Sequence, residues 1–251
     1  MISIVVHGGG RMAREVVKSI AAGGDRLAAV VSRSRPDWLG EEPWFAALDE
    51  LTDLPDLVID FTLPGGTMQV ADWCRARLVP LVSGTTGLTD SDRAGLEEAG
   101  ELVPVLWAPN LSKGLNMLLK DVSDAAARLG PETPVEILDV HHRHKQDAPS
   151  GTALSLAQAI ASVWGRELSD CLQLDGEPGE APRPGRIYCH SRREGEVVGE
   201  HRVRFLMADE SLEFIHAASD RNIYAAGSLE AGHWLLRQPA GLHGSADWLA
   251  G

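Results

Sequence analysis

Short apolar runs alternate with amphipathic stretches through the first 110 residues of the chain. The runs predict buried strands at residues 2–6, 27–31, 56–61, 80–84 and 103–108. Helices are expected between them, around residues 12–21, 65–77 and 90–100. In the first of these helices, Met12, Val16 and Ile20 fall one turn apart. Alternating strands and helices are typical of βαβ units, so the pattern predicts a parallel sheet with helices on its faces.

The pattern changes in the second half. Residues 135–141 predict a strand, and residues 152–164 predict a helix with Leu156, Ile160 and Trp164 on one stripe. Residues 172–186 are rich in glycine and proline and predict a loop.

Two runs of alternating apolar and polar residues follow this loop. Their more apolar positions are Val203, Phe205 and Met207, then Leu212, Phe214 and His216. The runs predict an antiparallel hairpin, and a final helix is expected at residues 224–236. The fold class expected is therefore α/β: a nucleotide-binding type of domain with a parallel sheet, followed by an antiparallel α+β domain.

Composition limits the function classes. The chain has 251 residues, 44% hydrophobic and 24% charged, which suits one large globular domain or two modest ones. Its apolar runs are too short to span a bilayer, and Met1 leads into one of them without the basic segment of a secretory signal. Three scattered cysteines without a Cys-x-x-Cys pair favour a reducing cytoplasm over a disulfide framework.

The formal net charge of −13 argues against nucleic acid or an anionic membrane as a partner. Most of the surface would repel an anionic substrate. Such a substrate would need a local positive site.

A glycine turn follows the first predicted strand. Gly8, Gly10 and Ala13 satisfy the G-x-G-x-x-A pattern, in which glycines let backbone N–H groups approach a pyrophosphate at the start of a helix. A glycine turn without a ligand is the alternative. The position directly after an apolar run favours a dinucleotide site.

The end of the second predicted strand distinguishes the cofactors. NAD sites usually place a carboxylate there, whereas this chain has Ser32, Arg33, Ser34 and Arg35, and its first acid is Asp37. Hydroxyl and guanidinium groups suit a 2′-phosphate, so we expect NADPH to be preferred, with NADH possible. A solvated polar loop is the alternative. The loops 60–67 and 83–87 also follow strands and could lie against the nicotinamide and its ribose.

Five consecutive residues, 141–145, can carry positive charge: His141, His142, Arg143, His144 and Lys145. A solvated charged surface is one interpretation, but three histidines make it less favourable because histidine titrates near neutrality. A zinc site is another, but we find no cysteine or carboxylate at a recognisable ligand spacing and predict no metal.

A helix is predicted to begin just after these cations. Pro149 stiffens the entry, Ser150 is a good N-cap, and Gly151 and Thr152 begin the helix with outward N–H groups. Such a helix start can hold a carboxylate or phosphate, although a capped helix without a ligand is the alternative. Together, these features suggest an NADPH-dependent reductase of a small polyanion, with Lys145 or the histidines as proton donor.

Several motifs resemble one family in order along nearly the full chain. They are "GGRMA", "DFTLPGGT", "SGTTGL", "APNLSKGLNMLL", "HHRHKQDAPSGTA", "GEVVGEH" and "AASDRNIYAAGSLEAGHWL". The chain is similar to the 4-hydroxy-tetrahydrodipicolinate reductase (dihydrodipicolinate reductase) family of lysine and diaminopimelate biosynthesis. The HH-x-x-K-x-D-A-P-S-G-T block is the most specific of these motifs.

The resemblance implies a Rossmann-type doubly wound domain at residues 1–112 and 222–251. It also implies an α+β substrate domain with an open mixed sheet at 113–221, and a homotetramer assembled through those sheets. The implied reaction is NAD(P)H-dependent reduction of 4-hydroxy-tetrahydrodipicolinate (dihydrodipicolinate), a small cyclic dicarboxylate, to tetrahydrodipicolinate.

The family's functional residues carry over by position. His141 would be a proton donor or acceptor and Lys145 the proton donor, while His142, Gly151 and Thr152 would hold the substrate carboxylates, with Ser150 close by. Beside Ser32 and Arg33, the cofactor would contact His7, Gly8, Gly9, Gly10, Arg11, Met12, Gly84, Thr85, Thr86, Ala108, Pro109, Asn110 and Leu111. Arg193 matches a family arginine to which no definite role is assigned.

Two positions depart from the family pattern. The family usually has glycine where His7 and Ala13 stand; Ala13 is an accepted replacement, but His7 adds bulk at the turn and could alter the fit of the cofactor. At Ser32 many members carry an acid followed by arginine, and its absence here reinforces the expectation of NADPH.

Two other functions are weighed. A dehydrogenase of another small dicarboxylate, such as aspartate, would share the two-domain plan but is disfavoured by the pairing of HH-x-x-K with S-G-T. A non-catalytic NADPH-binding regulator would not need His141 and Lys145 beside an anion site.

Overall fold

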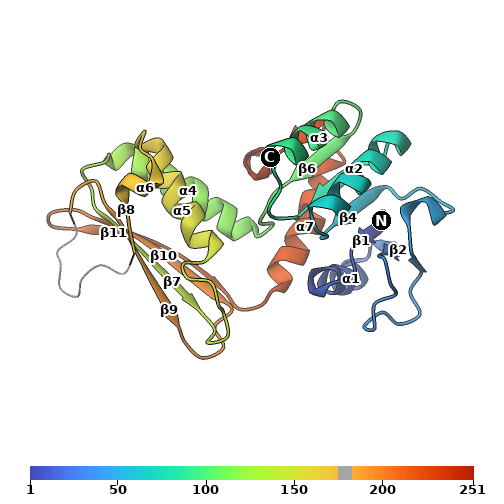
Figure 1. Ribbon diagram of the computed structural model, residues 1–251, viewed down its shortest axis with the longest axis horizontal. Helices are drawn as coiled ribbons and strands as arrows, with labels where there is room; N and C mark the ends of the chain where they lie inside the picture. The colour runs from blue at the N-terminus through green and yellow to red at the C-terminus, as the bar shows by residue number, and fades with distance from the viewer. Residues whose placement is uncertain (175–182) are drawn as a thin grey trace. The chain divides into compact units, whose positions relative to one another are not determined.

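The computed structural model describes residues 1–174 and 183–251. The chain divides into two compact units (Figure 1): a first unit of Met1–Lys113 with Arg221–Gly251, and a second unit of Gly114–Asp220. The boundaries expected from the sequence differ from these by one residue at each junction. Within the described ranges, no helix combines the length and the apolar character needed to cross a membrane.

A seven-stranded sheet forms the centre of the first unit, and all its strand pairs are parallel. In spatial order the strands are β3 (Trp44–Phe45), β2 (Arg26–Val31), β1 (Ser3–His7), β4 (Leu57–Asp60), β5 (Leu81–Ser83), β6 (Pro104–Trp107) and β12 (Gly241–His243). This is the doubly wound order, which reverses between β1 and β4. The five predicted strands are confirmed; β3 and β12 are too short to leave a pattern in the sequence.

Helices cover both faces of this sheet. Helices α1 (Arg11–Gly23), α7 (Asn222–Leu235) and α8 (Ser245–Ala250) contribute to one core, and α2 (Pro64–Arg77) and α3 (Asp90–Gly100) contribute to the other. Ile4 and Val6 of β1 belong to the first core and Val5 to the second. Because successive residues of a strand face opposite sides, a strand covered on both sides is continuously apolar.

The second unit is built on a five-stranded mixed sheet. Its strands in order are β11 (Ser211–Ala218), β10 (Gly199–Leu206), β7 (Val135–His141), β9 (Ile187–Arg193) and β8 (Leu172–Leu174). The β10–β11 hairpin is antiparallel as predicted, but β7, β9 and β8 run parallel. The pattern-based expectation of an antiparallel domain is therefore wrong, and the open mixed sheet implied by the resemblance is confirmed.

Helices α4 (Lys113–Leu129), α5 (Gly151–Val163) and α6 (Leu168–Cys171) lie on one side of this sheet (Figure 1). The predicted helix 152–164 begins and ends one residue earlier, as α5. The loop predicted at residues 172–186 is wrong at its start, because residues 172–174 form β8. Residues 175–182 of that prediction lie outside the described part of the chain.

On the helix-covered face of this sheet, paired residues of neighbouring strands form rows, and these rows determine where the polar side chains lie. Two apolar rows, Phe205–Val135–Ile187 and Val203–Ile137–Cys189, pack against α4 and α5. The next row on the same face is polar and runs across four strands: His216, His201, Asp139 and Ser191. His141 and Arg193 pair in the row beyond it. The polar groups therefore gather where the apolar core of the second unit ends.

Candidate active site

The glycine turn between β1 and α1 needs glycine at a position that the structure identifies. Gly8 has φ +129°, and a Cβ atom there would lie 2.9 Å from the carbonyl oxygen of Phe61. Gly9 passes close to Ser32 and Pro36, both 3.2 Å from the position of its missing Cβ. Gly10 caps the start of α1, and no atom lies within 4 Å of where its Cβ would be. The helix start is open, as anion binding requires.

A cavity of about 630 Å³ lies at this turn, where the strand order reverses. It is lined by the loops that follow β1, β2 and β4, the place where open α/β sheets bind ligands. Six predicted cofactor residues line it: His7, Gly8, Gly9, Gly10, Ser32 and Arg33.

A second cavity, of about 420 Å³, shares Gly10, Phe61 and Thr62 with the first. Eight further predicted cofactor residues line it: Arg11, Met12, Gly84, Thr85, Thr86, Pro109, Asn110 and Leu111. Ala108 lines neither cavity; it is buried, and its N–H donates to Ser83 O at 3.1 Å. Two neighbouring cavities with shared lining residues, at the carboxyl ends of the strands, suit an elongated dinucleotide.

Five residues that line only the larger cavity were not among the predicted site residues: Val31, Leu63, Gly65, Gly66 and Gln69. Three residues of the second cavity were not predicted either. Phe61 and Thr62 belong to the loop 60–67, which the sequence did mark, and Phe61 packs where a Cβ of Gly84 would be, 2.3 Å from its ring. Tyr224, from α7, lines the same cavity. No spacing in the sequence signals Tyr224, because it lies more than 110 residues beyond the other lining residues.

A buried carboxylate holds the loops of this site together. Asp60 is fully buried and accepts hydrogen bonds from the hydroxyls of four residues, at 2.7 to 3.1 Å: Thr62, Thr67, Ser83 and Thr85. Its Oδ1 also lies 2.9 Å from Nδ1 of His7. Burial would raise the pKa of Asp60, but the contacts with His7 and the hydroxyls outweigh it and lower that pKa.

The two arginines after β2 differ in their surroundings. Arg35 donates to Gly40 O at 2.5 Å, whereas Arg33 lines the larger cavity and has no ion pair among the described residues. Ser32 Oγ donates to Ser34 O and accepts from the indole N–H of Trp44. A guanidinium at the cavity edge is available to an anionic group of a ligand.

In the second unit, acids pair with several of the clustered cations. Lys145 Nζ lies 2.7 and 2.9 Å from the carboxylate oxygens of Asp147, and Arg143 pairs with Glu196 at 2.7 Å. The pair of Arg143 with Glu196 is exposed at both ends and is worth little free energy, whereas the side chain of Lys145 is largely covered. The stretch 141–145 is therefore less strongly cationic than the sequence indicated.

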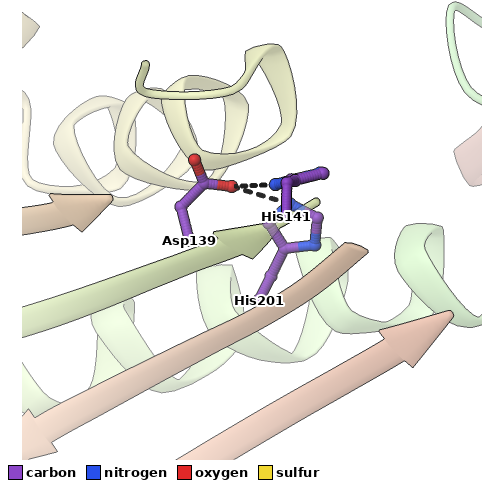
Figure 2. A group of neighbouring side chains, drawn as sticks. All are labelled: Asp139, His141 and His201. Atoms are coloured by element: carbon purple, nitrogen blue, oxygen red, sulfur yellow. Dashed lines mark ion pairs between the residues drawn. The ribbon is translucent and has the colours of Figure 1, made fainter. Parts of the chain in front are cut away.

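The carboxylate of Asp139 draws several side chains together (Figure 2). Its Oδ1 lies 3.0 Å from Nδ1 of His141 and 3.4 Å from Nε2 of His201, distances that suit ion pairs, although neither contact has the full geometry of a hydrogen bond. Its Oδ2 accepts the backbone N–H of Ser150 at 3.0 Å and lies 3.4 Å from Nη1 of Arg193.

Asp139 is fully buried, and its charge state follows from these contacts. Burial would raise the pKa of the carboxyl, but the interactions with His141, His201 and Ser150 outweigh burial and lower it. Asp139 is consequently ionised at neutral pH. Since a buried charge is costly without partners, the surrounding donors are part of one network.

The start of α5 is capped as predicted. Ser150 Oγ accepts the N–H of Ala153 at 3.2 Å, and Gly151 is exposed while Thr152 is half-buried. The N–H groups of a first helical turn have no acceptor within the helix, so this end can receive an anion. His142 is half-buried, and its ring centroid lies 6.2 Å from that of the exposed His144.

Asp139 and His201 were missed by the sequence interpretation, which found no carboxylate to complete a metal site. Asp139, His141 and His201 place one potential ligand atom each within 4.8 Å of one another. Asp139 could have been found, because alternation along a strand puts residues 139 and 141 on one face. His201 could not, because its register with β7 is not written in the sequence.

Comparisons with known proteins agree along the whole chain. Residues 2–111 match the model of the dihydrodipicolinate reductase N-terminal domain, and residues 114–249 match that of the C-terminal domain. A 4-hydroxy-tetrahydrodipicolinate reductase from Alkalilimnicola ehrlichii is 38% identical over 260 aligned residues, covering 98% of this chain and 97% of that protein.

Solved structures show the same fold. A dipicolinate-bound dihydrodipicolinate reductase from Paenisporosarcina sp. TG-14 has a TM-score of 0.81 at 26% identity, over 98% of each chain. The diaminopimelate (DAP) dehydrogenase of C. glutamicum, in complex with DAP, has a TM-score of 0.59 at 14% identity, over 99% of this chain and 95% of that one. The second likeness extends to the fold alone.

Proposed function

The chain belongs to the dihydrodipicolinate reductase family, and we propose that it catalyses the NAD(P)H-dependent reduction of 4-hydroxy-tetrahydrodipicolinate to tetrahydrodipicolinate in lysine and diaminopimelate biosynthesis. The observation that carries the proposal for this chain is local. The strand end that carries His141 and the helix start at Ser150 meet at one buried carboxylate, that of Asp139.

The cofactor domain fits a nicotinamide dinucleotide. The open helix start at Gly10 suits the pyrophosphate. The turn before it requires glycine at position 8, because a side chain there would collide with the backbone of Phe61. Gly84, Thr85 and Pro109 line the second cavity and would hold the nicotinamide and its ribose. When bound, NAD(P)H supplies the hydride, from C4 of its nicotinamide ring.

The second unit would bind the substrate and supply the proton. The N–H groups of Gly151 and Thr152, with His142, would hold the substrate carboxylates, in keeping with the dipicolinate bound to the relative from Paenisporosarcina. Hydride addition leaves negative charge on the substrate, which a proton must neutralise. Lys145 and His141 are the groups that would provide this proton.

We further propose that NADPH is preferred over NADH. Arg33 is at the edge of the larger cavity and has no competing ion pair among the described residues, and no carboxylate occupies the strand end at Ser32 to repel a 2′-phosphate.

The assembly proposed is a homotetramer that uses the open face of the second unit. That face carries half-buried and exposed side chains, among them Leu138, Arg202, Arg204 and Ile215, opposite the helix-covered face. The three cysteines are buried free thiols, which supports a reducing, cytoplasmic location. Light scattering of the purified protein at several concentrations tests the assembly.

A coupled assay tests the activity. The cyclic substrate is generated enzymatically, and oxidation of NADPH and NADH is followed by the loss of absorbance. We expect rapid oxidation of NADPH, slower oxidation of NADH, and none when the substrate-generating enzyme is left out. Cofactor oxidation with oxaloacetate and ammonia, but none with the cyclic substrate, would instead identify an aspartate dehydrogenase. Cofactor binding without turnover of either substrate would favour a regulator.

A further inference from the structure

We propose that Asp139 is a positioning residue of this reaction: it fixes the tautomer of His141 and ties that histidine to the helix start that receives the substrate. The inference deepens the proposed function and rests on it. Asp139 itself is fully buried, so it acts through the groups around it.

The position of Asp139 follows from the strand. Residues 139 and 141 of β7 are two apart, so both side chains are on the face that α4 and α5 cover. Asp139 pairs in register with His201 and Ser191, and His141 pairs with Arg193 one row further on. The carboxylate therefore lies beneath the histidine, on the side of the apolar core, where water does not screen its charge.

The first oxygen of the carboxylate acts on His141. Oδ1 lies 3.0 Å from Nδ1, and a negative charge at that distance favours a proton on Nδ1. The neutral ring then keeps its lone pair on Nε2, which becomes the nitrogen that exchanges a proton with a substrate. Nε2 lies 3.1 Å from the point where a Cβ of Gly199 would be, so a side chain on the neighbouring strand would shift the ring by a few tenths of an ångström.

The second oxygen acts on the helix start. Oδ2 accepts the N–H of Ser150 at 3.0 Å, immediately before Gly151, and contacts Nη1 and Nη2 of Arg193 at 3.4 and 3.5 Å. Arg193 also donates to the carbonyl of Asp147, whose side chain pairs with Lys145. One carboxylate thus links the proton-exchanging histidine, the anion-receiving helix start and, through Arg193, the loop of Lys145.

A bound metal ion is the competing use of these atoms, since Asp139, His141 and His201 could supply three ligands. The guanidinium of Arg193 already lies against the same carboxylate, and a metal ion would place a second cation beside it. The positioning role needs no ion and uses both oxygens.

A double-mutant cycle tests the role, with steady-state kinetics on Asp139→Asn, His141→Gln and the combined variant. Loss of the carboxylate that orients a catalytic histidine lowers kcat by about 10⁴-fold in Ser-His-Asp triads, and general acid–base groups contribute about 10²–10⁴-fold. We expect Asp139→Asn to lower kcat by at least about 100-fold and to leave the NADPH dissociation constant unchanged. In the His141→Gln background, the same change should lower kcat much less, because only the action of the second oxygen on the helix start is left to lose. Losses that multiply would show that Asp139 acts independently of His141.

Asp124→Asn is the matched control, because Asp124 is an exposed acid of the same unit, paired with Lys120 on α4. Its kcat should equal that of the unchanged protein. Circular dichroism and thermal unfolding identify any variant that fails to fold.

Nitrogen-15 NMR of the histidines tests the tautomer in the unchanged protein, without turnover. The resonances of His141 are assigned by their loss in His141→Gln. We expect the neutral ring to carry its proton on Nδ1 in metal-free protein, and a proton on Nε2 would overturn the proposal. A stoichiometric metal ion whose removal by a chelator changes these resonances would also overturn it. If His141 has the expected tautomer but the protein does not turn over the cyclic substrate, the proposed function is wrong and the positioning role is not contradicted.

Discussion

Nδ1 of His7 lies 2.9 Å from Oδ1 of Asp60, at the end of the first strand of the cofactor domain. The pair explains how a histidine is accommodated where the family usually has glycine. The ring contacts a buried carboxylate, and the position that requires glycine is the next one, Gly8. His7 nevertheless lines the larger cavity, so an effect on the fit of the cofactor stays a prediction.

Replacing His7 by alanine should destabilise the first unit. Asp60 would keep its four hydroxyl donors but lose its nitrogen partner, and an under-satisfied buried group costs about 1–3 kcal/mol. Urea unfolding followed by tryptophan fluorescence measures this loss of stability. Six of the seven tryptophans belong to the first unit and only Trp164 to the second, so the signal reports mainly on the first unit. His233→Ala is the matched control: His233 also pairs with an aspartate, Asp25, but is 45% exposed, so its loss should cost less than about 1 kcal/mol. Equal losses of unfolding free energy in His7→Ala and His233→Ala would contradict the idea that burial makes the His7–Asp60 pair the stronger one.

The lowered pKa of Asp60 predicts a loss of stability in acid. The ionised carboxyl is favoured in the folded state, so its contribution is complete above the unfolded-state pKa of about 3.9 and declines as the pH falls through the folded-state pKa. The difference in unfolding free energy between the unchanged protein and Asp60→Asn should therefore shrink as the pH falls from about 5 towards 2. A difference that stays constant over this range would mean that Asp60 is not ionised in the folded protein.

Much of the first unit could be predicted from its sequence because both faces of its sheet are covered. Continuous apolar runs and the glycine turn are local features, and five of its strands follow from them. The short strand β12 and the cavity residue Tyr224 could not be predicted, since both depend on the chain returning to this unit after residue 220. Such contacts are set by tertiary packing rather than by local pattern.

The candidate site of the second unit was predictable only in part. The block around His141 and Ser150 is contiguous, so its strand end and helix start could be identified. The row His216–His201–Asp139–Ser191 depends on the register of four strands separated by up to 77 residues, and no local spacing reveals it. The pairing of Lys145 with Asp147 was equally hidden, because the sequence shows charges but not their geometry.

Arg33→Ala should weaken NADPH binding more than NADH binding. Arg33 lines the larger cavity, and only NADPH carries a 2′-phosphate for a guanidinium to pair with. Charge-assisted pairs of this kind contribute about 1.5–3 kcal/mol, or roughly 10- to 150-fold in the dissociation constant. Fluorescence titration with each cofactor measures the effect. Arg35→Ala is the control, since Arg35 is bound to Gly40 O, and should change neither constant; equal losses of both cofactors in Arg33→Ala would exclude a phosphate contact.

Lys145→Ala should lower kcat by about 10²–10⁴-fold, the range for loss of a general acid. NADPH affinity should stay unchanged, because the residues that line the cofactor cavities all belong to the other unit. Arg143→Ala serves as the control: it removes a neighbouring cation whose pair with Glu196 is exposed, and should keep kcat within about twofold. Turnover by Lys145→Ala within a few-fold of the unchanged protein would rule it out as the donor.

Gly199→Ala should impair catalysis while leaving the fold intact. The added Cβ would lie 3.1 Å from Nε2 of His141, closer than most carbon contacts, and 3.8 Å from Cε1 of His201. Because the ring of His141 must move by a few tenths of an ångström, its nitrogen leaves the place from which it exchanges a proton. A displacement of about 1 Å can cost 10²-fold in rate, so this smaller shift should lower kcat by about 10-fold. Gly23→Ala, where the Cβ meets no atom within 4 Å, controls for the glycine replacement itself. An unchanged kcat in Gly199→Ala, with normal thermal unfolding, would show that proton transfer does not depend on where His141 is held.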